Sequence, residues 1–345
     1  MVYTFELFKH ANIHYRDAVE RLARCELLTM LRSLSVFCEV TIEQAGTSRF
    51  LTFECRELKD CELKYLSGHS SVALMAEKKE PWLRPLPVAS GLYLPEDLPE
   101  VLKYKGKTGV PFTRMMINTA YALASARHHQ IPPVFFDPVC GKATGCFCAL
   151  MTGMNAVGLD TDQKALKEAA DYFERYLKYH KLKHEIRNRS ETFGKASVPV
   201  SDAFFADTKD HYLSGNVRHL TLACADTADS AALFRRRRAD LIAADLPYGV
   251  QHASLSGRKP ESLPRFLHRV LPVWKGVLRP GGTIALSFNT LTLPSAHVRE
   301  VLEQAGFILP REDWYDSLRH EVEQAVIRDV IFALNPEEEC SDDTK

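Results

Sequence analysis

The feature that most constrains the fold of this 345-residue chain is a repeated alternation of strand and helix patterns. From Val134 to Leu334, short apolar runs of strand length alternate with longer segments whose apolar residues recur at helical spacing. Parallel neighbours in a sheet need such crossover segments between them. We therefore expect an α/β fold with a doubly wound, mainly parallel sheet, in which ligands bind beyond the carboxyl ends of the strands.

The same patterns place the individual elements of this region. Strands are expected at residues 134–136, 156–159, 219–224, 241–244, 283–288 and 325–334. Helices are expected at residues 112–126, 145–154, 163–179, 263–277 and 296–305. Residues 183–217 form a polar segment to which no element is assigned.

The N-terminal part predicts a separate, small α/β (α+β) unit. Its pattern indicates strands at residues 3–8, 36–42 and 50–55 and helices at residues 15–34 and 63–76. Recurrent prolines then mark a linker, because each removes a backbone donor and restricts its predecessor. The expected parts are residues 1–95 with this linker, the doubly wound domain at residues 96–335, and an acidic, disordered tail at residues 336–345. The N-terminal unit is either a packing or dimerisation domain or a substrate-docking module.

Composition narrows the class of protein. Lys plus Arg and Asp plus Glu both number 44, so a nucleic-acid site has to be a local basic patch. The chain shows neither a secretory leader nor an apolar run of membrane-spanning length, so we expect a cytoplasmic protein without a membrane partner. Nine scattered cysteines without paired Cys-x-x-Cys spacing predict free thiols and no metal site.

The stretch from Ala239 to Gly249 carries the strongest chemical signal. An apolar run of strand length ends in Asp245, and Leu246, Pro247 and Tyr248 follow it before a glycine. This pattern presents a carboxylate, bare backbone and an aromatic ring at the end of a sheet. Turn statistics alone also account for Asp, Pro and Gly at a strand exit.

Two more strand ends indicate a ligand with a ribose. After the first strand, Asp137 opens a glycine-containing turn up to Gly145 that leads into a helix, where small residues let a ligand approach the backbone. The second strand ends in Asp160, and an acidic residue there commonly binds ribose hydroxyls. Asp162 is more simply explained as the N-cap of the next helix. Asp226, after the third strand, is placed either to bind the exocyclic amine of an adenine or to be an ordinary loop acid.

In this order, Asp137-Pro138-Val139-Cys140-Gly141, Val157-Gly158-Leu159-Asp160 and Asp245-Leu246-Pro247-Tyr248-Gly249 resemble the motifs of Rossmann-fold S-adenosylmethionine-dependent amino-methyltransferases. Within that group the chain most resembles the Trm11-like and THUMP-associated RNA guanine-N2 methyltransferases. The resemblance covers residues 101–334. It implies a Rossmann-like methyltransferase sheet, S-adenosyl-L-methionine as cofactor, and RNA, most often tRNA, as partner.

The resemblance also assigns residues to the cofactor. Together with the strand-end reasoning it gives this set: Asp137, Pro138, Cys140, Gly141, Thr144, Asp160, Asp226 and Thr113, the last from a cofactor-flanking segment at residues 112–114. The chain departs from the family at Ala143, where a second glycine is usual. We therefore expect that turn to adopt a conformation that a Cβ tolerates. No THUMP domain is recognisable in residues 1–80.

The chemistry of an exocyclic amine explains the catalytic set, Asp245, Leu246, Pro247 and Tyr248. The lone pair of such an amine is delocalised into the ring, so the nitrogen has to be held in line with the methyl group that it attacks. Asp245 accepts one N–H, the carbonyl of Leu246 or Pro247 accepts the other, and Tyr248 stacks on the base. The leading Asp, in place of Asn, favours an RNA guanine by the same resemblance.

Four basic residues are expected to contact substrate phosphates: Lys105, Lys107, Arg258 and Lys259. The sequence thus predicts a methyltransferase that modifies an exocyclic amine in RNA, with guanine N2 of tRNA as its target. A DNA adenine or cytosine amino-methyltransferase is one alternative. A non-catalytic nucleic-acid-binding protein on a methyltransferase fold is another, and Ala143 is its best support.

Overall fold

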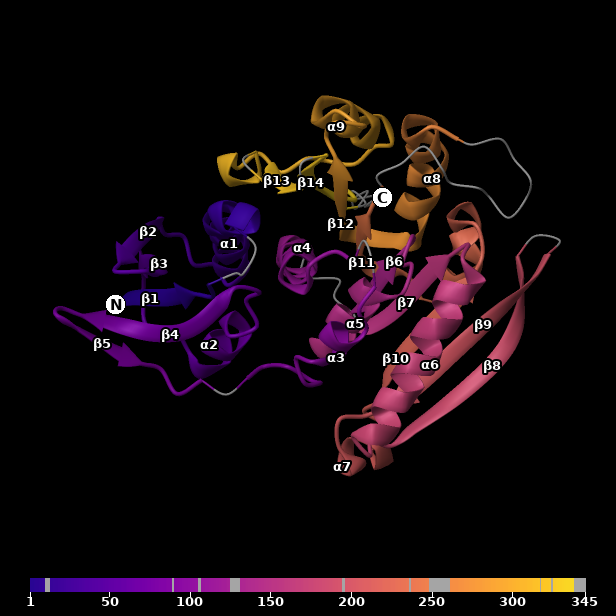
Figure 1. Ribbon diagram of the computed structural model, residues 1–345, viewed down its shortest axis with the longest axis horizontal. Coiled ribbons are helices and arrows are strands. Elements are labelled where there is room, and N and C mark those ends of the chain that lie inside the picture. The colour runs from indigo at the N-terminus through magenta and orange to yellow at the C-terminus, as the bar shows by residue number, and fades with distance from the viewer. Residues whose placement is uncertain are drawn as a thin grey trace, which may run out of the picture.

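A computed structural model describes residues 1–9, 13–88, 90–104, 107–124, 131–193, 196–235, 237–247, 261–316, 318–323 and 325–337. Within these residues the chain forms two sheets. A five-stranded sheet has the order β2-β3-β1-β4-β5, and a nine-stranded sheet has the order β13-β14-β12-β11-β6-β7-β10-β9-β8. Figure 1 shows the small sheet with its helices on one side of the molecule and the large sheet on the other.

The small sheet is antiparallel throughout. Its strands are β1 (Val2–Leu7), β2 (Val40–Ala45), β3 (Ser48–Glu54), β4 (Val72–Lys79) and β5 (Trp82–Pro85). Alternate residues of β1, Tyr3, Phe5 and Leu7, are buried. They pack in one cluster with residues of the helices α1 (Ile13–Ser33) and α2 (Asp60–Leu66). The period of two along β1 therefore gives the sheet its covered face.

The expected helix at residues 63–76 is wrong in its second half. Helix α2 ends at Leu66, and Val72–Lys79 forms strand β4 between β1 and β5. The segment from Ser67 to Ser71 is a polar, glycine-containing break, and Ser67 caps the helix. Residues 72–79 form a strand because of a tertiary contact, in which β4 completes the hydrogen bonds of the otherwise unpaired edge of β1.

The large sheet is the doubly wound sheet that the alternation predicts. Its strands are β6 (Val134–Asp137), β7 (Asn155–Asp160), β8 (His184–Phe193), β9 (Ala196–Phe205), β10 (Arg218–Cys224), β11 (Ala239–Asp245), β12 (Leu278–Asn289), β13 (His320–Glu323) and β14 (Val326–Leu334). The five strands β10-β7-β6-β11-β12 are parallel and have the 3-2-1-4-5 order of the Rossmann fold. Antiparallel strands extend the sheet at both edges. The predicted fold class, a mainly parallel Rossmann-like sheet with a small α+β domain, is confirmed.

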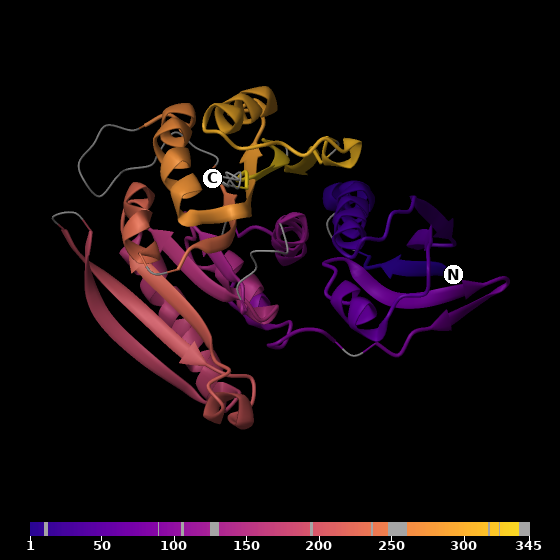
Figure 2. The same ribbon diagram turned by 180° about the vertical axis from the view of Figure 1, so that it is seen from behind.

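Both faces of the parallel strands are covered, which explains their continuous apolar runs. Phe135 and Leu241 pack in the cluster that includes residues of α4 (Val110–Leu123), α5 (Thr144–Met151) and α6 (Gln163–Tyr179). Phe136 and Ile242, one residue on, pack with α8 (Leu263–Val277) and α9 (Ser295–Gln304). Figures 1 and 2, seen from opposite sides, show these two helical layers. The remaining short helices are α3 (Leu98–Val101), α7 (Lys209–Leu213), η2 (Thr227–Phe234) and η3 (Asp313–Tyr315).

The polar segment at residues 183–217 contains structure that the sequence pattern did not indicate. Strands β8 and β9 form a long hairpin, and β9 adds to the edge of β10. Figure 1 shows this hairpin extending away from the centre of the sheet, beside α6. The pattern of β8 is mostly polar because most of its residues are exposed or half-buried, so no apolar run marks it as a strand.

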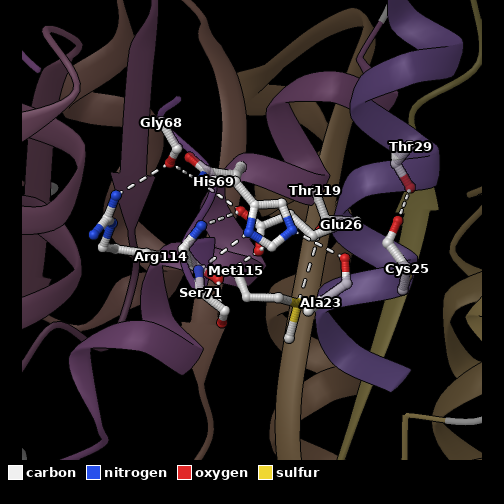
Figure 3. A network of polar contacts seen from close by, with 12 residues as sticks. Ala23, Cys25, Glu26, Thr29, Gly68, His69, Ser71, Arg114, Met115 and Thr119 are labelled. Carbon is white, nitrogen blue, oxygen red and sulfur yellow. Dashed lines mark hydrogen bonds and ion pairs between the residues drawn. The ribbon is translucent and has the colours of Figure 1, made fainter. Parts of the chain in front are cut away.

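A buried polar network joins helix α1, which packs on the small sheet, to helix α4, which packs on the large sheet (Figure 3). Glu26 of α1, which is fully buried, accepts hydrogen bonds from Asn118 Nδ2 of α4 at 2.7 Å and from the backbone N–H of Ser70 at 2.8 Å. His69 Nδ1 accepts from the N–H of Ser71, so its Nε2 carries the proton and donates to Ala23 O at 3.0 Å. The network ties α1 and the α2–β4 connection to α4.

The boundary expected near residue 95 stays a prediction. The last strand of the small sheet ends at Pro85, and both Leu94 and Leu98 pack in the core cluster of the large sheet. The expected tail begins at residue 336, and residues 338–345 lie outside the described residues.

Candidate active site

A pocket of about 200 Å³ opens at the carboxyl ends of β6 and β11. Asp137 and Asp245 end these two neighbouring strands and both line the pocket. Gly141 and Thr144 line it from the β6–α5 turn, and Thr113 lines it from α4. The structure thus brings together residues from the first and third motifs and the flanking helix, at the edge where doubly wound sheets bind ligands, whereas no residue of the second motif lines the pocket.

Close packing explains two glycines around this turn. At Gly145, an added Cβ would stand 2.6 Å from Oδ2 of Asp137, so only a glycine lets helix α5 begin against that carboxyl. At Gly158 of β7, an added Cβ would stand 2.9 Å from the sulfur atoms of both Cys140 and Cys146. The β6–α5 turn is therefore pressed onto the sheet at the level of the pocket.

Ala143 corrects the expectation for this turn. Instead of a conformation that suits a Cβ, it adopts the left-handed one, with φ +63° and ψ +27°, as the N-cap of α5. This region costs a non-glycine residue on the order of 1–2 kcal/mol. Gly141 has φ +51° and open space where a Cβ would stand. The turn keeps the shape of a glycine loop, so Ala143 does not argue against a ligand there.

Asp137 is the electrostatically unusual residue of the pocket. The pKa of its carboxyl is raised to about 8, chiefly by burial and also by the charges of Asp160 and Asp245, against the opposing effect of a hydrogen bond from the N–H of Val139. The side chain therefore carries a proton at neutral pH. A buried carboxyl that carries a proton and faces a cavity is typical of functional sites.

Asp160 holds the turn itself. Its Oδ2 accepts from the N–H of Gly141 at 2.7 Å, and its Oδ1 accepts from the N–H of Asp162 at 2.9 Å. Asp162 caps α6 through the N–H groups of Lys164 and Ala165, as expected. The ribose contact of Asp160 stays a prediction.

Asp245 has a set of partners that the sequence analysis missed. Ser287 Oγ donates to its Oδ1 at 2.7 Å, and Thr108 Oγ1 donates to its Oδ2. Arg328 Nη2 lies 3.8 Å from Oδ2, with a nearly buried side chain, whereas the side chain of Asp245 is 30% exposed. Ser287 and Asp245 are register partners in the β11–β12 ladder. No local pattern marks these partners, because sheet order alone brings them together.

The other predicted residues of the catalytic and cofactor sets divide as follows. Leu246 is buried and its N–H donates to Ser287 O at 2.8 Å, while Pro247 is half-buried. Cys140 and Thr144 line the pocket, and Thr144 Oγ1 shares a hydrogen bond of 2.8 Å with Tyr104. Tyr248 lies outside the described residues, and Pro138 is buried in the turn.

Asp226 and the basic residues lie in other surroundings. Asp226 caps η2 through the N–H of Ala228, and its Oδ1 also accepts from Arg269 Nη1 at 2.9 Å. Its adenine contact stays a prediction. The ammonium of Lys107 donates to the carbonyls of Pro99 and Leu102, which gives this lysine a structural role. Three residues of the expected phosphate set lie outside the described residues: Lys105, Arg258 and Lys259.

The described residues contain no candidate metal centre and no candidate membrane span. No group of three or more His, Cys, Asp or Glu side chains there is arranged to hold a metal ion. No described helix is both long and apolar enough to cross a membrane. The cysteines in the described part of the chain are free thiols, as expected.

Comparisons with known proteins find similarity to solved structures only. No family model and no curated protein matches it. It is similar to TrmN from Thermus thermophilus, with 16% identity and a TM-score of 0.40 over 86% of this chain and 59% of that one. It is also similar to a SAM-dependent methyltransferase from Agrobacterium tumefaciens (13% identity, TM-score 0.37, 65% and 60% covered). A third similar structure is a putative rRNA-methylase from Clostridium thermocellum (17%, 0.33, 59% and 89%).

The likeness to the first two structures covers only part of their length. The chain spans 59% and 60% of the length of the first two structures. Because the identities and TM-scores are low, the likeness carries no argument about substrate or cofactor. The fold assignment therefore rests on the strand order and directions of the large sheet itself.

Proposed function

We propose that this protein is an S-adenosyl-L-methionine-dependent methyltransferase that modifies an exocyclic amine of a nucleobase in RNA, with guanine N2 of tRNA as the target. One observation carries the proposal. One pocket is lined by a buried carboxyl with a raised pKa, Asp137, and by a carboxylate that is 30% exposed, Asp245, which accepts from hydroxyl donors. Two carboxyl groups in such different environments are suited to two different tasks.

The cofactor half of the proposed site is the β6–α5 turn with the end of β7. Asp137, Gly141 and Thr144 line the pocket, and the open space at Gly141 lets a ligand approach the backbone. Asp160 fixes this backbone through the N–H of Gly141 and keeps lone pairs for ribose hydroxyls. When bound, the cofactor supplies an activated methyl group on a sulfonium ion.

The target half is the end of β11. Asp245 accepts an N–H of the amine and so directs the nitrogen lone pair toward the methyl group. Leu246 is anchored to β12 by its N–H, and the carbonyl of Leu246 or Pro247, in the peptides that follow, accepts the second N–H. Because the methyl donor is already activated, Asp245 acts by orientation and electrostatics, and the proton leaves to water after transfer.

The proposal is tested with labelled cofactor. The protein is incubated with methyl-labelled S-adenosylmethionine and, separately, total tRNA, ribosomal RNA and duplex DNA, and the labelled nucleoside is identified by mass. We expect label in N2-methylguanosine of tRNA. Label in DNA adenine or cytosine alone would support a DNA amino-methyltransferase instead.

A pair of variants separates catalysis from binding. Asp245→Ala is expected to abolish transfer while calorimetry still detects cofactor binding. Asp162→Ala, which removes an exposed carboxylate from a helix cap outside the pocket, is the control and is expected to keep transfer. Near-wild-type transfer by Asp245→Ala would refute the assignment. A wild-type protein that binds RNA but no cofactor would favour the non-catalytic alternative.

A further inference from the structure

The strongest unexplained feature is a chain of hydrogen bonds that runs from Arg328 through Thr108 to Asp245, which we call the relay. Arg328 of β14 has an exposed fraction of 5%, and its guanidinium carbon lies 4.8 Å from the ring centre of Phe112 in the first turn of α4. From this position its Nη2 lies 3.3 Å from Thr108 Oγ1 and 3.8 Å from Asp245 Oδ2. Thr108 in turn donates to Asp245.

The direction of each hydrogen bond from Arg328 to Asp245 follows from which groups can donate. A guanidinium only donates hydrogen bonds, so the Thr108 hydroxyl has to accept from Arg328 and to donate its single proton to Asp245. Ser287 likewise donates its hydroxyl proton to the other oxygen of the carboxylate. The hydroxyls of Thr108 and Ser287 therefore both donate to Asp245 and have no proton left for a substrate. At this end of the pocket the side chains offer acceptors to a substrate, which matches an amine N–H.

We propose that Arg328, acting through Thr108, is a positioning residue that holds the Asp245 carboxylate in one orientation, so that it receives N–H donors and excludes acceptor-only groups. This inference rests on the proposed function and adds the residues that set its geometry. It also gives α4 a role in placing Arg328, because the guanidinium packs over the ring of Phe112 in that helix. Charge-assisted hydrogen bonds of this kind are stronger and more directional than neutral ones.

The test uses one isosteric and one conservative variant of Thr108. Thr108→Val removes the hydroxyl at constant shape, and Thr108→Ser keeps it; Thr108 is half-buried, so both variants are expected to fold. We expect Thr108→Val to lower kcat by about 10- to 100-fold, with little change in the cofactor Kd. Thr108→Ser is expected to restore kcat to within about threefold of wild type. Equal activity of Thr108→Val and wild type would overturn the proposal.

A double-mutant cycle tests whether Arg328 acts through Thr108. We expect Arg328→Gln to lower kcat and the double variant Thr108→Val/Arg328→Gln to be no worse than the more damaged single variant. If the fold losses in kcat of the two single variants multiply in the double variant, Arg328 acts independently of Thr108, and the relay is overturned. Loss of cofactor binding in Thr108→Val would show a structural role instead. If wild type itself transfers no methyl group, the proposed function and the relay both fall, whereas an active wild type with silent variants refutes only the relay.

Discussion

Strand β11 has an aspartate near each end, and the two side chains have opposite surroundings. Asp240, at the amino end, is fully buried, and its carboxylate accepts from Arg279 Nε at 2.6 Å and from the N–H of Val134 at 2.8 Å. Asp245, at the carboxyl end, is 30% exposed and lines a pocket. The same side chain on one strand thus serves as a structural ion pair at one end and as a candidate catalytic group at the other.

The difference extends to the neighbours of each end. Around Asp240, strands β6, β11 and β12 are joined by satisfied hydrogen bonds. Around Asp245, Asp137 has a strongly raised pKa and Ala143 is left-handed. Functional sites commonly keep such unfavourable features, at a cost in stability, because the rest of the fold holds them in place. We infer that the amino end stabilises the sheet and the carboxyl end gives up stability for chemistry.

The largest expected effect separates the two aspartates directly. Asp240→Ala removes one partner of a buried ion pair and leaves Arg279 without that partner, which is expected to lower the free energy of unfolding by about 3–5 kcal/mol. Asp245→Ala is expected to cost no more than about 1 kcal/mol, because its carboxylate is partly solvated. Urea denaturation of both variants measures the difference. Equal losses would contradict the division between the two ends.

The next effect concerns Asp137 and depends on pH. Below about pH 4 its carboxyl is protonated in both the folded and the unfolded chain. Between there and pH 8 only the unfolded chain ionises, so the free energy of unfolding falls as pH rises, and above about pH 8 the loss is complete. Asp137→Asn lacks this titration, so we expect its stability relative to wild type to grow by about 1.4 kcal/mol per pH unit over the interval.

Urea midpoints of wild type and Asp137→Asn at pH 5, 7 and 9 measure this divergence. The variant is also expected to lose affinity for S-adenosylmethionine, which would show stability gained at the expense of binding. Parallel stability curves for the two proteins from pH 5 to 9 would show that Asp137 is not neutral in the folded chain.

The smallest effect is local strain in the β6–α5 turn. Ala143→Gly relieves the left-handed conformation, but it also makes the unfolded chain more flexible, so we expect a net gain of about 0.5–1 kcal/mol. Ala149→Gly is the control, because Ala149 lies buried inside α5, where the same change is expected to cost about 1 kcal/mol or more. Thermal unfolding of both variants checks the opposite signs. A destabilised Ala143→Gly would refute the strain.

Periodicity predicted the helices of the large domain well. Helices α6 and α8 have the predicted bounds, residues 163–179 and 263–277, because each has one buried and one exposed face and so a clear 3.6-residue pattern. The hairpin of β8 and β9 was missed, since its outer strand is mostly solvated and carries few apolar residues. Strand β4 was taken for a helix because short apolar runs do not distinguish the two.

The sequence by itself determined the sheet's class and the three strand-end aspartates, Asp137, Asp160 and Asp245, because both follow from local patterns of apolar residues and turns. Only the tertiary structure decided what surrounds Asp245. Ser287 is its register partner on β12, and Arg328 reaches it from β14, which runs antiparallel beside β12. Sheet order and register bring such partners together across the chain, and no local pattern encodes them.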